Sequence, residues 1–159
     1  MGPDGTLVSS TRKEWLVGAL AMILPALGCT ALGFLTKDPE DLPGDRIAGF
    51  EERWLATVLM PNEIPHALAE VHRLFDFAQS TPEEFYRCAG PVMEVDSDPA
   101  EAAVNSPDLL AEYLHDENVG HLTYFFAFFK GLRKIMVDAQ LDNKAVLHVR
   151  QVFLFRRVD

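Results

Sequence analysis

The chain has few basic residues and few cysteines, and it lacks the short motifs of common enzyme classes. It contains 14 Lys and Arg against 24 Asp and Glu, a formal net charge of −10 at pH 7. Because nucleic-acid binding demands a basic face, this composition argues against a nucleic-acid partner. The two cysteines, Cys29 and Cys88, form neither a CxxC pair nor a zinc-binding spacing. A Gly-rich phosphate loop and a GxSxG nucleophile motif are also missing.

Charge is also missing from the 21-residue run between Trp15 and Leu35, which holds no His, Asp, Glu, Lys or Arg. As a helix this run would be roughly 31 Å long, close to the ~30 Å hydrocarbon core of a bilayer. The sequence therefore predicts one transmembrane helix over residues 15–35, kinked near Pro25. A fully buried core helix is one alternative. A secretory signal is another, because Arg12 and Lys13 precede the run; we interpret the segment as retained.

Small side chains recur along this apolar run. They would let a neighbouring helix approach closely, as in membrane helix packing. Without an ionisable side chain, the run offers no ligand for a pigment, a proton or an ion, so we expect an anchor and a packing surface. The small residues are Gly18, Ala19, Ala21, Ala26, Gly28, Ala31 and Gly33.

The negative charge is concentrated in the middle of the chain. Residues 36–105 carry 5 basic and 15 acidic side chains, whereas residues 106–159 carry 7 of each. Arg12 and Lys13 precede the apolar run and only Lys37 follows it closely. The positive-inside rule then favours a lumenal, periplasmic or intermembrane C-terminal domain. We expect an integral protein of a thylakoid, mitochondrial inner or bacterial inner membrane.

The expected fold class is mainly α, with one transmembrane helix before a small helical domain. Helical periodicity predicts helices over 47–60 and 62–80, a short one after Thr81, and others from Ser106 and His121. The tail 145–158 is β-branched and aromatic, so it forms either a helix or a strand, and a strand would imply pairing with another chain. The predicted division is an extension at 1–14, the span at 15–35, a linker at 36–46, and a helical domain at 47–159 with an acidic loop at 91–107.

Aromatic and basic side chains crowd the segment that begins at His121. Five rings at nearly consecutive positions would cover most of a helix circumference, at about 100° per residue. We therefore expect some of them to contact lipid, a pigment-like ligand or another subunit; the core helix of a small bundle is the alternative. The predicted contact residues are Tyr124, Phe125, Phe126, Phe128, Phe129, Lys130, Arg133 and Lys134.

One constellation suggests a metal. Glu63 and His66, and likewise Glu112 and His115, have the Glu-x-x-His spacing that ferritin-like di-iron proteins use, and Glu84 precedes Glu112 by 28 residues. The matching position 28 residues before Glu63 is a leucine in the apolar run. A complete set of four carboxylates is therefore missing, and we predict no tightly bound metal, no catalytic residue and no cofactor.

Three functional classes follow. The first is a non-catalytic accessory subunit of a multi-subunit membrane complex, of a photosynthetic or respiratory kind, with other subunits and the lipid bilayer as partners. The second is a membrane-tethered di-iron carboxylate enzyme that uses the Glu-x-x-His sites. The third is a soluble helical binding module that buries residues 15–35 in its own core. We expect the first, because no catalytic constellation is complete.

Overall fold

The computed structural model describes residues 5–10, 14–36, 57–108, 120–149 and 152–157. The fold is mainly helical, which confirms that part of the predicted fold class. The elements in chain order are β1 (Gly5–Ser10), α1 (Glu14–Ala26), η1 (Ala31–Leu35, a 3₁₀ helix), β2 (Thr57–Leu59), η4 (Pro61–Glu63, also 3₁₀), α2 (Ile64–Ser80), α3 (Pro82–Ala89), α4 (Pro99–Asn105), α6 (His121–Leu141), β3 (Lys144–Val149) and β4 (Val152–Arg157).

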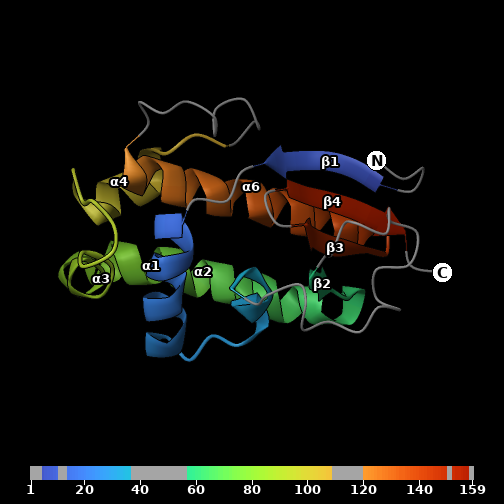
Figure 1. The fold of residues 1–159 in the computed structure, drawn as a ribbon, viewed down its shortest axis with the longest axis horizontal. Helices are drawn as coiled ribbons and strands as arrows, with labels where there is room; N and C mark the ends of the chain where they lie inside the picture. Colours follow the sequence, from blue (N-terminus) through green and yellow to red (C-terminus); the bar gives the residue numbers. More distant parts are fainter. Residues whose placement is uncertain (1–4, 11–13, 37–56, 109–119, 150–151, 158–159) are drawn as a thin grey trace.

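Two long helices, α2 and α6, lie alongside each other, and the other elements pack around this pair (Figure 1). Helix α1 crosses this pair, and α3 and α4 pack at one end of it. The sheet packs on α6 near the end that leads into β3, and η1 lies between α1 and the sheet. The residues nearest the middle of this arrangement come from α1, η1, α2 and α6.

The C-terminal segment is a β-hairpin. Strands β3 and β4 are antiparallel, with Lys144 opposite Arg157 and Val149 opposite Val152. The sheet has the order β1-β4-β3-β2, so both strands also have a neighbour within the chain. The expectation that a C-terminal strand would pair with another chain is therefore wrong. Residues 5–10, predicted as part of a separate extension, supply the partner strand of β4.

The apolar run from Trp15 to Leu35 does not form one helix, so the prediction of a continuous span is wrong. Helix α1 ends at Ala26, where Pro25 lies in its last turn, and Gly28 follows with a φ of 66°. After this left-handed turn the chain continues as η1. Among the described helices, none is long and apolar enough to cross a membrane.

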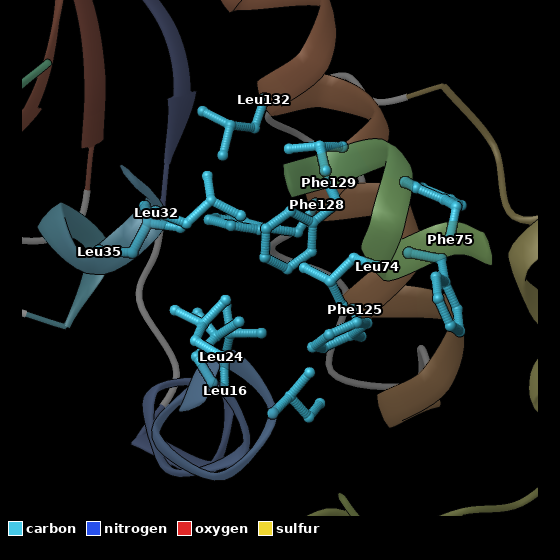
Figure 2. Packing of buried hydrophobic residues seen from close by; sticks show 14 of the residues in the cluster. Leu16, Leu24, Leu32, Leu35, Leu74, Phe75, Phe125, Phe128, Phe129 and Leu132 are labelled. Carbon is cyan, nitrogen blue, oxygen red and sulfur yellow. The ribbon is translucent and has the colours of Figure 1, made fainter. Parts of the chain in front are cut away.

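One side of α1 lies in the core, as Figure 2 shows for Leu16 and Leu24, which point toward Phe125 and Phe128 of α6. Leu16, Leu20 and Leu24 are at most 4 % exposed. The apolar run is thus split between a buried face of α1 and a buried 3₁₀ turn. This resembles the core-helix alternative more closely than a membrane span.

In the middle of the chain, most helices of the structure agree with those predicted from the spacing of apolar residues. Helix α2 lies within the predicted range 62–80 and buries an apolar stripe that includes Ile64, Val71 and Phe75, and α3 begins directly after Thr81. The acidic segment 91–107 contains the short helix α4, whose first turn is capped by the Asp98 carboxylate. The predicted helix 47–60 is wrong at its described end, where residues 57–59 form β2. The rest of that helix, the linker 36–46 after residue 36, and the helix expected to follow Ser106 from residue 109 on lie outside the described residues.

Candidate functional site

The described members of the metal constellation do not come together. The Glu63 carboxylate accepts a hydrogen bond from the Met60 backbone N–H at 2.7 Å, which is a helix-capping role. His66 is exposed on the first turns of α2, and Glu84 is exposed on α3 beyond the other end of α2. Helix α2, with 17 residues and a length of roughly 25 Å, separates the first pair from α3 along the chain.

Glu112 and His115 lie outside the described residues. Within the described part of the chain, no three His, Cys, Asp or Glu side chains lie close enough together to hold a metal ion. His121 has a packing role instead: its ring stacks on Trp15 with 4.2 Å between centroids, and its Nδ1 accepts the Glu94 backbone N–H at 2.9 Å.

The five aromatic side chains of α6 are all buried, so the expectation that some must face outward is wrong. They are at most 5 % exposed. The physical reason is the position of α6, which contacts α2, α4 and strands β1 and β3 of the sheet. The rings also pack on one another, with centroids of Phe125 and Phe126 separated by 5.1 Å and of Phe128 and Phe129 by 5.2 Å.

The three basic residues that follow these rings lie in different environments. The Lys130 ammonium donates to the backbone carbonyls of Val104 and Ser106, at the end of α4. Burial lowers the pKa of Lys130, and the Asp108 carboxylate opposes this shift. The Arg133 guanidinium lies over the Phe75 ring at 5.3 Å, whereas Lys134 is exposed. The three cations therefore do not form one docking patch.

A buried carboxylate, which the sequence analysis did not single out, organises the turn after α1. Glu70 of α2 is 7 % exposed and accepts hydrogen bonds from three consecutive backbone N–H groups, at 2.9, 3.0 and 2.8 Å. These N–H groups belong to Thr30, Ala31 and Leu32. The Arg73 guanidinium donates to Cys29 Sγ at 3.2 Å. Burial, and then the Glu70 carboxylate, raise the pKa of the Cys29 thiol.

Two surfaces remain available to a partner. The first is the outer face of α1, which we define as Gly18, Ala21, Met22, Pro25 and Ala26. Ala21, Met22, Pro25 and Ala26 are exposed, Met22 by 48 %, whereas Gly18 is half-buried and packs against the Val92 side chain. Since α1 contains no polar side chain after Glu14, this outer face is wholly apolar. A helix on the surface of a protein normally carries a polar outer face.

The second surface is a groove of about 840 Å³ on α3 and the segments that flank it. Its lining combines rigid prolines, an exposed tyrosine and charges of both signs. The lining residues are Pro82, Glu83, Tyr86, Arg87, Gly90, Pro91, Asp98 and Pro99. The sequence signal that could have found this site is Pro82 at the start of α3 together with Gly90-Pro91 after its end, because all three residues line the groove.

Comparison with known proteins finds no family, no curated protein and no solved structure that matches this chain. The functional interpretation therefore depends on these two surfaces and on the chemistry of their residues.

Proposed function

We propose that the protein is a non-catalytic accessory subunit that docks onto a larger assembly through the outer face of α1. The observation that carries this proposal is the apolar outer face of a helix whose opposite face already belongs to the core. Met22 alone leaves 48 % of its surface exposed there. Exposed apolar surfaces of this kind, when contiguous, mark protein or membrane contacts.

The spacing of the outer face supports a helix as the partner element. Its residues follow the intervals i, i+3, i+4, i+7 and i+8, which define one stripe along α1. Val92 already lies over Gly18, but Ala21, Pro25 and Ala26 are exposed and small or compact, so the backbone of a partner helix can approach closely at that end of the stripe. Met22 is the flexible side chain that can fill the remaining gap. An uncharged stripe suits an apolar partner helix, and we propose a subunit of a photosynthetic or respiratory membrane complex.

This proposal does not require α1 to cross a bilayer, because docking onto a membrane complex needs only a contact with one of its subunits. The di-iron enzyme has less support, since its described candidate ligands are separated by the length of α2.

The substitution Met22→Glu tests the docking face. A carboxylate in the apolar contact would have to be desolvated without a partner, so we expect the protein to leave its native assembly. The measurement is the size of the assembly on native gels after extraction in mild detergent. Since Met22 is exposed, the free energy of unfolding should change by less than about 0.5 kcal/mol.

The matched control is Val137→Glu on α6, where the original side chain is also apolar and 40 % exposed. We expect this variant to stay in the assembly. Equal release of both variants would contradict a specific role for α1. Flotation of the wild type with phosphatidylcholine vesicles, lost in Met22→Glu, would assign the face to lipid and contradict the subunit contact.

A further inference from the structure

The groove on α3 lies on a different side of that helix from α1. On α3 the Cys88 thiol donates to the Met22 carbonyl of α1 at 3.4 Å, and Phe85 is fully buried in the core. The groove is lined instead by Pro82, Glu83, Tyr86 and Arg87. The groove and the outer face of α1 are therefore formed by different residues.

The surroundings of the groove are strongly acidic. Between residues 82 and 101 there are six carboxylates and one basic side chain, Arg87, which gives a net charge of −5. All six carboxylates are exposed. The one salt bridge among the described residues joins Lys144 and Asp142, so no described residue forms an ion pair with any of these charges. The six are Glu83, Glu84, Glu94, Asp96, Asp98 and Glu101.

The exposed ring of Tyr86 adds a second recognition element. This side chain is 55 % exposed, although it follows the fully buried Phe85. A Lys or Arg side chain over the face of such a ring gains a cation–π interaction. Glu83 precedes Tyr86 by three residues, so both lie on the same side of α3. A single cation can thus contact the ring and a carboxylate together.

We propose that this groove binds a short, extended segment of a partner protein that carries Lys or Arg side chains. One basic side chain lies over Tyr86 and pairs with Glu83, and a second pairs with Asp98 across the groove. Arg87 supplies N–H donors for backbone carbonyls of the bound segment. Pro82, Pro91 and Pro99 hold the walls in place, which reduces the entropy lost on binding.

The test uses the full chain and a fluorescein-labelled peptide of twelve residues built from Lys, Ser and Gly. Matched peptides carry Gln or Glu in place of each Lys. Fluorescence anisotropy should detect binding of the Lys peptide alone, weakened by added salt. In amide NMR spectra of the protein, the Lys peptide should shift residues 82–91 and 98–99 most.

Substitutions separate the groove from general attraction to an acidic protein. Tyr86→Ala should weaken binding about threefold to tenfold, and Tyr86→Phe should retain it, because the ring provides the contact. Glu83→Gln should also weaken binding. The control Asp76→Asn removes the same charge from an exposed position on α2 and should have little effect. Met22→Glu should bind the peptide normally, which makes this proposal independent of the docking face on α1.

Three results would overturn the proposal. The first is equal binding of the Lys and Gln peptides. The second is an equal loss of affinity in Asp76→Asn and Glu83→Gln, which would mean only diffuse attraction between charges. The third is a set of NMR shifts spread over the whole acidic surface or confined to other elements.

Discussion

At the scale of single residues, Glu70 is the group on which the local structure depends most. Among the described residues no cation forms an ion pair with this buried carboxylate, and its oxygens accept from three backbone N–H groups that begin η1. The first N–H groups of a helix have no acceptor within the helix, and a carboxylate at this position supplies one. Its negative charge also interacts favourably with the positive end of the helix dipole. Sequence periodicity places Glu70 on α2 beside the buried Val71. No local pattern predicts that its carboxylate accepts hydrogen bonds from backbone N–H groups about 40 positions earlier in the chain.

Glu70→Ala should destabilise the protein by about 2–4 kcal/mol, because three buried or part-buried N–H groups lose their acceptor. Urea denaturation followed by far-UV circular dichroism measures this change. Asp76→Ala, an exposed carboxylate on the same helix, serves as the control and should change stability by less than about 0.5 kcal/mol. A loss below about 1 kcal/mol for Glu70→Ala would show that water replaces the carboxylate there.

At the scale of elements, the spacing of apolar residues predicted helices that have a clear polar side, such as α2. The prediction was wrong for residues 15–35, which have no polar side. The stripe of α2 and the start of α3 after Thr81 agree with the structure because local spacing determines them. The Thr81 side chain does not cap α3, because its hydroxyl donates to the Phe77 carbonyl of α2. For residues 15–35, an uncharged run fits a membrane span and a core segment equally well. Two features end the helix and fold the run into the core: the left-handed conformation of Gly28 and the hydrogen bonds to the distant Glu70 carboxylate. A hydropathy profile shows neither of them.

The turn after α1 gives a direct test at this scale. Gly28 has a φ of 66°, a conformation that costs an L-residue about 1–2 kcal/mol, and a Cβ there would meet no atom within 4 Å. Gly28→Ala should therefore destabilise the protein by about 1 kcal/mol through backbone strain alone. Gly33→Ala is the matched control, because its Cβ also meets nothing and its φ is ordinary. Equal effects of the two substitutions in thermal unfolding would contradict the strained turn.

At the scale of the whole molecule, burial depends on how many neighbours surround an element. The aromatic side chains of α6 cover most of its circumference, and in a simple two-helix contact some would be exposed. The chain instead surrounds α6 with α2, α4 and β3, while Trp15 of α1 contacts the Tyr124 ring edge-on. Sequence spacing predicted the directions of these rings on α6. It could not predict which elements cover them, because α1, α2, α4 and β3 come from distant parts of the chain.

This arrangement predicts that the aromatic cluster determines global stability. Phe126 is fully buried, and its ring lies 5.5 Å from those of Phe75 and Phe85 and 5.1 Å from that of Phe125. Phe126→Ala should cost about 3–5 kcal/mol, a large part of the 5–15 kcal/mol that typically stabilises a domain. We expect loss of near-UV circular dichroism and a lower midpoint in urea.

Tyr86→Ala removes an exposed ring and is the control for the aromatic cluster, with an expected change near 0.5 kcal/mol or less. If the α6 rings served mainly as a contact for another subunit, Phe126→Ala would resemble Tyr86→Ala in the isolated protein and would differ from it only in the assembly. The buried cluster predicts the opposite order: the isolated chain should lose stability first, and any loss of partner binding should follow from unfolding.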